Sequence, residues 1–263
     1  MSEASRRQFL QGASLAGAAV VATTAVSSAI ADEAAAYDYT CDVVVAGAGV
    51  GGLAAAVAAV EQGVSVILVE ASGHVGGTSR FAAGAFGPRF GTDWDVVYKK
   101  VPLSDPDLGK VVCNEWEETL SWIQGMGLVT EPLSEGSSYV WMGGRRPVEQ
   151  GSKSYTDEYL QQFGQIFTDK GGATLLSTKA TDLILDADGT PCGLICTAAD
   201  GVIKIGAKQV IIATGGFQAN KEMMSRYLGR HADISQPQCM PYLDGTGIIM
   251  AQKAGAKLSK AFG

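Results

Sequence analysis

A glycine-rich segment, GAGVGG at residues 47–52, has the spacing of a phosphate-binding turn. In this GxGxxG pattern, Gly47 permits a tight turn, Gly49 lets a pyrophosphate approach the backbone, and Gly52 lets a helix pack closely on a strand. A helix that begins here would direct free N–H groups and a positive dipole end at the phosphates. Glu70 adds a carboxylate that can accept hydrogen bonds from the hydroxyl groups of a ribose. Together these residues predict a dinucleotide site.

The elements expected around this segment form a βαβ unit. Residues 41–46, CDVVVA, are an unbroken apolar run typical of a buried strand, and residues 49–62 are an alanine-rich helical stretch. Gly63 would end that helix, and residues 64–69, VSVILV, predict a second strand, parallel to the first through a right-handed crossover. A glycine-rich turn beside a solvated glutamate is the competing interpretation. The strand before the motif, the helix after it and the acidic residue after the next strand favour the dinucleotide site.

The rest of the sequence predicts an α/β fold with a small antiparallel β insertion. The patterns indicate an irregular segment over 86–151 with one helix near 108–126, a helix over 155–170, antiparallel strands over 173–176, 180–185 and 191–197, a buried strand over 208–213 and a helix over 245–256. The sequence DADG at 186–189 supplies a turn between two of these strands.

Composition and charge argue against several classes of protein. The chain has 263 residues, 46% hydrophobic and 18% charged, which is typical of one large globular domain or two small ones. Its formal net charge of −7 leaves no basic surface to neutralise the phosphates of a nucleic acid or an anionic membrane. The five cysteines lack the CxxC spacing of a zinc site, and the two histidines, His74 and His231, are far apart. We therefore expect no nucleic acid partner and no metal site.

The beginning of the chain carries the features of a twin-arginine export signal. A pair of arginines lies in the sequence SRRQFL, and an uncharged, alanine-rich stretch follows over 11–31. The sequence AIA at 29–31 offers a cleavage site. A membrane-spanning helix is the competing interpretation, but the stretch is only weakly apolar and contains threonines and serines. We expect a signal peptide over 1–31 and a linker over 32–40. We also expect export to the periplasm, the cell surface or the extracellular space, and no membrane span after cleavage.

Two stretches after Glu70 distinguish among dinucleotides. They read ASGHVGGTSRFAAGAFGP at residues 71–88 and QVIIATGGFQANKEMM at residues 209–224. With these stretches, the chain resembles the FAD domain of the fumarate reductase and 3-ketosteroid dehydrogenase superfamily over about residues 41–258, most of all the soluble fumarate reductases of flavocytochrome c type. The resemblance implies a Rossmann-like FAD-binding domain over 41–263 and FAD as the cofactor.

The resemblance also implies which residues contact FAD. Residues 76–79 and 82–84 would wrap around the flavin side of the cofactor, the backbone at Ala180 would meet the adenine, and residues 213–216 would lie against the adenosine. The predicted FAD-binding residues are Gly47, Gly49, Val50, Gly51, Gly52, Glu70, Ala71, Gly76, Gly77, Thr78, Ser79, Ala83, Gly84, Ala180, Ala213, Thr214, Gly215 and Asp244.

One segment departs from the family pattern. Residues 244–247 read DGTG, where family members usually read TGDG. The acidic contact with the flavin is therefore shifted or lost. Asp244 is the candidate that would replace it from a neighbouring position.

The resemblance implies a reaction but assigns no catalytic residue. Family enzymes transfer a hydride from the flavin N5 to an activated C=C bond, with an arginine as proton donor beneath a separate capping domain. No residue of 1–263 matches those catalytic positions, so we expect the capping domain to be absent from this chain. The implied partners are an unsaturated acid or enone as electron acceptor and an external donor such as a cytochrome or an FMN protein. A half-length FAD-binding or electron-carrier module and an inactive truncated family member are the alternatives.

Overall fold

The computed structural model of the chain describes residues 37–101, 105–142 and 155–258. The signal peptide expected over 1–31 lies outside these residues, as does most of the linker expected over 32–40.

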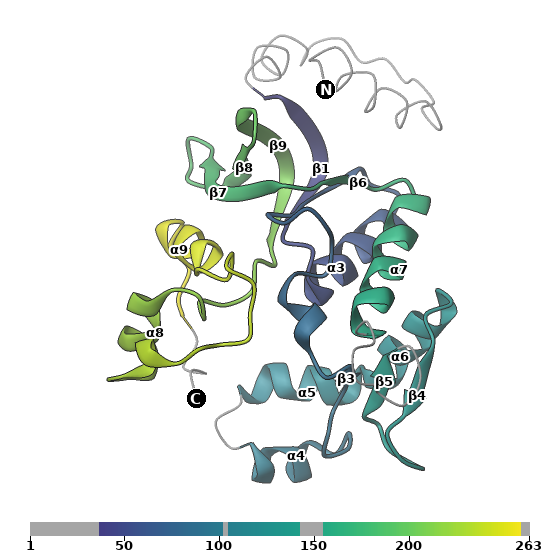
Figure 1. Cartoon of the computed structure of the whole chain (residues 1–263). Coiled ribbons are helices and arrows are strands. Elements are labelled where there is room, and N and C mark those ends of the chain that lie inside the picture. Colours follow the sequence, from purple (N-terminus) through teal and green to yellow (C-terminus); the bar gives the residue numbers. More distant parts are fainter. Residues whose placement is uncertain (1–36, 102–104, 143–154, 259–263) are drawn as a thin grey trace.

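The described residues form both helices and strands, and several of each follow one another along the chain (Figure 1). The helices are α3 (Val50–Glu61), α4 (Trp94–Lys100), α5 (Pro106–Asn114), α6 (Trp116–Gly125), α7 (Tyr155–Asp169), α8 (Lys221–Leu228) and α9 (Thr246–Lys253), with 3₁₀ turns η1 (Gly77–Phe81) and η2 (Ala232–Ile234). The strands are β1 (Tyr39–Ala46), β2 (Val66–Val69), β3 (Ala85–Phe86), β4 (Thr130–Pro132), β5 (Val140–Met142), β6 (Ala173–Leu175), β7 (Thr178–Leu185), β8 (Pro191–Ala198) and β9 (Gly201–Ile212).

A six-stranded sheet with the order β6-β2-β1-β9-β8-β7 is the centre of the fold. β6, β2, β1 and β9 pair in parallel, whereas β9, β8 and β7 form an antiparallel meander. Val44, Val45 and Ala46 of β1 are fully buried, because the parallel part of the sheet is covered on both faces. The parallel part and the meander confirm the predicted α/β class with an antiparallel insertion.

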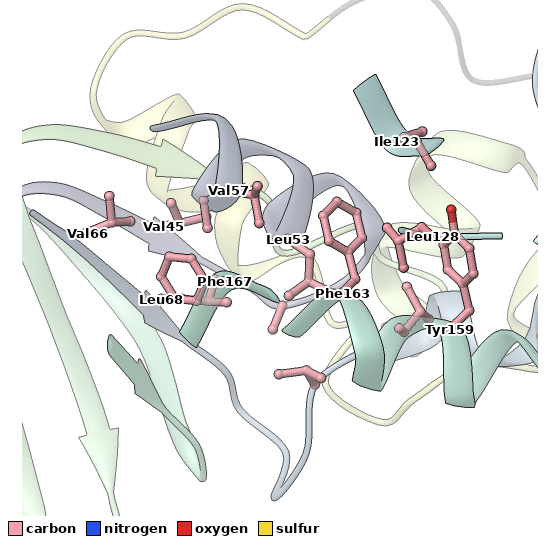
Figure 2. Packing of buried hydrophobic residues seen from close by; sticks show 14 of the residues in the cluster. Val45, Leu53, Val57, Val66, Leu68, Ile123, Leu128, Tyr159, Phe163 and Phe167 are labelled. Carbon is pink, nitrogen blue, oxygen red and sulfur yellow. The ribbon is translucent and has the colours of Figure 1, made fainter. Parts of the chain in front are cut away.

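One hydrophobic core lies between this sheet and the helices α3 and α7. Figure 2 shows Phe163 and Phe167 of α7 among Leu53 and Val57 of α3 and Leu68 of β2. Phe163 is 2% exposed and Phe167 is fully buried. These two phenylalanines are four positions apart, so they lie on the same face of the helix, and that face packs on α3 and the sheet.

The opposite face of the sheet has a second core. Val44, Ile67 and Val69 pack there with Leu194 of β8 and Met250 of α9. Because successive side chains of a strand point to opposite faces, the neighbours of these residues in β1 and β2 belong to the first core. The second core holds α9 beside β7, and Figure 1 shows the two elements next to one another.

Two of the strand predictions were wrong in part. The strand expected over 173–176 is not antiparallel, since β6 pairs in parallel with β2 and places Ala173 opposite Ile67. The strand expected over 208–213 is the end of a longer strand, β9, which begins at Gly201 and pairs with β8 over its first half. Local sequence indicates an extended segment, but the partner and direction of a strand depend on which elements the fold brings beside it.

The segment expected to be irregular over 86–151 is more regular than predicted in its described part. The helix expected over 108–126 is two helices, α5 and α6, which meet at Glu115. Asp93 caps α4 and Asp105 caps α5, each with a carboxylate oxygen that accepts hydrogen bonds from two backbone N–H groups. β3, β4 and β5 form a small antiparallel sheet. The two aspartates are the sequence signal that identifies these helix starts.

The described residues also bear on membrane and metal binding. No helix within residues 37–101, 105–142 and 155–258 combines the length and the apolar character that crossing a membrane requires. Over the same residues, no three side chains of histidine, cysteine, aspartate or glutamate come together in an arrangement that could hold a metal ion.

Replacing Phe163 with alanine should lower the free energy of unfolding by about 3–5 kcal/mol, because it leaves a cavity between α7 and α3. Urea unfolding followed by circular dichroism measures this change. Leu108→Ala is the matched control, since Leu108 lies in α5 and is 66% exposed. The control should change the free energy of unfolding by no more than about 0.5 kcal/mol. Equal losses in both variants would contradict the core described above.

Candidate cofactor-binding site

A cleft of about 630 Å³ lies at the carboxyl ends of β1, β2 and β9. This volume is within the range of small-molecule sites, and the carboxyl ends of parallel strands are where open α/β sheets bind ligands. The cleft is lined by Gly47, Gly49, Val50, Gly51, Val69, Glu70, Ala71, Gly77, Thr78, Ser79, Thr178, Lys179, Ala180, Ile212, Ala213, Thr214, Gly215, Tyr242, Leu243, Asp244 and Thr246.

Most of the predicted FAD-binding residues line this cleft. They are Gly47, Gly49, Val50, Gly51, Glu70, Ala71, Gly77, Thr78, Ser79, Ala180, Ala213, Thr214, Gly215 and Asp244. Gly52, Gly76, Ala83 and Gly84 are described residues that do not line it. Gly76 supports the glycine-rich turn from behind, because its N–H donates to the carbonyl oxygen of Ala48 at 2.7 Å. Direct contact of each predicted residue with FAD stays a prediction.

The sequence analysis missed several residues of the lining. They are Val69, Thr178, Lys179, Ile212, Tyr242, Leu243 and Thr246. All of them lie within two positions of Glu70, Ala180, Ala213 or Asp244, so including the chain neighbours of each predicted site residue would have found them.

The glycine-rich turn contains glycines that the fold requires and glycines that leave space for a ligand. Gly47 has a φ of +101°, and a Cβ there would lie 2.5 Å from a carbonyl oxygen of the loop after β9. A Cβ at Gly52 would lie 1.8 Å from the carbonyl oxygen of Gly47. At Gly49 the nearest atom to a Cβ is Ser79 Oγ at 3.4 Å, and at Gly51 no atom lies within 4 Å. The space in front of Gly49 and Gly51 fits a pyrophosphate held against the backbone.

The start of α3 supplies hydrogen-bond donors to this space. Gly49, the N-cap residue of this 12-residue helix, has no side chain to cap it, and the first turn carries no acidic residue. The N–H of Val50 donates to Ser79 Oγ at 3.1 Å. The first N–H groups of a helix have no partner within the helix, and the positive end of the helix dipole lies there. The start of α3 is therefore suited to an anion.

Glu70 ties together the ends of the first two strands. Its side chain is buried, with the whole residue 5% exposed. One carboxylate oxygen accepts a hydrogen bond from the N–H of Ala48, and the other accepts one from the N–H of Ser72, both at 2.8 Å. Each oxygen keeps a second lone pair, so the carboxylate can still accept from a ribose hydroxyl. The ribose contact itself stays a prediction.

Asp244 lies in the wall of the cleft formed by the segment before α9. Its Oδ1 accepts hydrogen bonds from the N–H and the hydroxyl of Thr246, at 3.0 and 2.6 Å, and its Oδ2 lies 2.5 Å from Lys179 Nζ. Burial alone would raise the pKa of the Asp244 carboxyl, but Lys179 and Thr246 outweigh burial and hold this pKa below its usual range. Asp244 is therefore ionised at neutral pH. Its proposed replacement of the acidic flavin contact stays a prediction.

Comparison with known proteins agrees with this geometry. Residues 42–262 match the FAD binding domain family. The chain belongs to this family. It is 32% identical to the urocanate reductase of Eggerthella lenta, over 82% of this chain and 38% of that protein. It is 27% identical to a probable fumarate reductase of Shewanella frigidimarina, over 84% of this chain and 40% of that protein.

A solved structure of a related flavoprotein is also similar to this chain. The open conformation of a flavocytochrome c3 fumarate reductase matches with a TM-score of 0.72 and 25% identity, over 90% of this chain and 44% of that chain. The chain therefore spans less than half the length of these relatives. The predicted family resemblance, the fold class and FAD as the cofactor are confirmed.

Replacing Gly49 with alanine should raise the dissociation constant for FAD roughly tenfold or more, because a methyl group would occupy the space of the pyrophosphate. Flavin absorbance retained after gel filtration measures the loss. Gly125→Ala is the control, since Gly125 lies in α6, outside the cleft lining, and a Cβ there meets no atom within 4 Å. The control should retain FAD fully. Full retention in Gly49→Ala would contradict the placement of the pyrophosphate.

Replacing Glu70 with glutamine should lower the free energy of unfolding by about 1–3 kcal/mol, because an amide NH₂ would face a buried N–H that loses its acceptor. FAD retention should fall as well, since the turn at Ala48 would shift. Urea unfolding and flavin absorbance measure the two effects. Glu118→Gln, an exposed site in α6, is the control and should change neither quantity. A stable Glu70→Gln variant with full FAD retention would refute the role of this carboxylate.

Proposed function

We propose that the chain is the FAD-binding part of an exported oxidoreductase of fumarate reductase type, which reduces the activated C=C bond of an unsaturated acid or enone. The observation that carries this proposal is the cleft whose glycines, Gly49 and Gly51, leave space for a pyrophosphate within a chain of the FAD binding domain family. The relatives named as fumarate reductase and urocanate reductase support the class of substrate, because fumarate and urocanate are both unsaturated acids.

The residues of the cleft would hold FAD in an extended form. The first N–H groups of α3 would bind the pyrophosphate, and Glu70 would accept a hydrogen bond from the ribose. Ala180 would meet the adenine through its backbone, while Gly77, Thr78 and Ser79 of η1 would lie toward the flavin. FAD, when bound, supplies hydride transfer at the flavin N5.

The proton donor and the substrate-binding residues would come from outside residues 1–263. They would belong to further residues of the native polypeptide or to a partner chain, and a cytochrome or an FMN protein would deliver the electrons. The proposed route of export is the twin-arginine pathway, and the expected signal over 1–31 lies outside the described residues. Export by this pathway would carry the protein after it has folded around its cofactor.

The proposal predicts different behaviour for the chain alone and for the native assembly that contains it. The purified chain should show flavin absorbance but no turnover of fumarate, urocanate or an enone with reduced viologen as donor. The native assembly, isolated from its source, should turn over at least one of these acceptors. Its intact mass, which should lack residues 1–31, tests export in the same preparation.

Each contrary result has a distinct meaning. A chain without flavin would contradict both the enzyme and an electron carrier. Robust turnover by the chain alone would show that the proton donor lies within residues 1–263. A native assembly that holds FAD but reduces no acceptor would favour the electron-carrier module.

A further inference from the structure

Two ion pairs among the described residues join β7 to α9 or to the residues just before it. Lys179 Nζ lies 2.5 Å from Asp244 Oδ2, and both residues line the cleft. Lys253 Nζ lies 3.0 Å from Asp182 Oδ2, and neither residue lines the cleft. The side chains of the first pair are 34% and 32% exposed, and those of the second are 59% and 41% exposed. The first pair is thus the better shielded and the one that a bound cofactor would meet.

The Lys179–Asp244 pair lies beside the expected position of the ribose. The backbone carbonyl of Glu70 accepts a hydrogen bond from the N–H of Thr178 at 2.8 Å, and Lys179 is the next residue of β7. Since the acidic residue after the second strand of a dinucleotide fold binds the ribose, Lys179 belongs to the adenosine end of the cleft. The inference therefore assigns its partner Asp244 to the adenosine end as well, in place of the predicted contact with the flavin.

Lys179 also offsets one of the two carboxylate charges of the cleft. Among the described residues that line the cleft, the charged side chains are Glu70, Lys179 and Asp244. A dinucleotide brings two negatively charged phosphates. Without the ammonium group of Lys179, Asp244 would lose its cationic partner, and its carboxylate would repel these phosphates more strongly.

The two partners differ in how firmly they are held. The carboxylate of Asp244 is fixed by two hydrogen bonds from Thr246, and its backbone carbonyl accepts one from Asn220 Nδ2 at 2.9 Å. Lys179 reaches Asp244 on a flexible four-carbon side chain. Rotation of the lysine alone can therefore open the pair without any movement of the backbone.

We propose that the Lys179–Asp244 ion pair is a clasp that closes the adenosine end of the cleft and slows the release of FAD. Release requires Lys179 to swing away from Asp244, and re-formation of the pair retains the adenosine. The clasp rests on FAD binding in this cleft and does not depend on the proposed reduction of unsaturated acids.

The test is a double-mutant cycle on the FAD-loaded chain. The release rate is measured from the rise in flavin fluorescence after dilution, for Lys179→Met, Asp244→Asn and the double variant. Each single variant should release FAD about fivefold faster, a factor expected for a partly shielded ion pair, and the double variant should be no faster than either. Asn at position 244 can still accept the hydrogen bonds from Thr246. Lys179→Arg should restore slow release.

The second ion pair provides the matched control. Lys253→Met and Asp182→Asn remove a contact between α9 and β7 that lies outside the cleft. These variants should leave the rate of FAD release unchanged. If variants of both pairs release FAD equally fast, the clasp is overturned, because both pairs would then only hold α9 and the residues before it against β7. Unchanged release in Lys179→Met would overturn it too. If the double variant releases FAD much faster than Lys179→Met does, the effect comes from a direct contact between Asp244 and FAD. A wild-type chain without flavin would instead contradict the cofactor site itself.

Discussion

The close packing of α3 on the turn after β1 is the constraint on which the rest of the site depends. The carbonyl oxygen of Gly47 occupies the place that a Cβ at Gly52 would need, and the loop after β9 occupies the place of a Cβ at Gly47. Three segments therefore meet without room for a side chain. This contact brings the start of the helix to the ends of the parallel strands, where its N–H groups face the cleft. The two cores on either side of the sheet hold these elements in place.

In the proposed binding mode, the cleft would hold its anionic cofactor chiefly through backbone groups. Among the described lining residues, Lys179 is the positively charged side chain, and it is paired with Asp244. The pyrophosphate would therefore rely on the helix dipole and on the N–H groups near Gly49 and Gly51. Backbone donors of this kind need no basic cluster. This explains how a chain with a formal net charge of −7 can hold a cofactor with two phosphates.

The sequence-based predictions were accurate where the structure depends on residues close together in the chain, and less accurate where it depends on contacts between distant segments. The βαβ unit was predicted well, because its glycine pattern and apolar strands are local signals. The helical character expected over 108–126 was correct, but the break at Glu115 that divides it into α5 and α6 was missed. Parallel pairing of β6 with β2 was also missed, because a short extended segment carries no information about the direction of its partner.

By itself, the sequence determined the glycine turn, the buried strands beside it and the carboxylate of Glu70, because each is specified by residues close together in the chain. Through its resemblance to a family, it also identified FAD as the cofactor. Only the tertiary structure decided that Glu70 bonds the N–H groups of Ala48 and Ser72, and that Lys179 meets Asp244 across the cleft. The Lys179–Asp244 contact joins residues far apart in sequence, and the pairing of β7 with β8 and the packing of α9 on β7 bring them together.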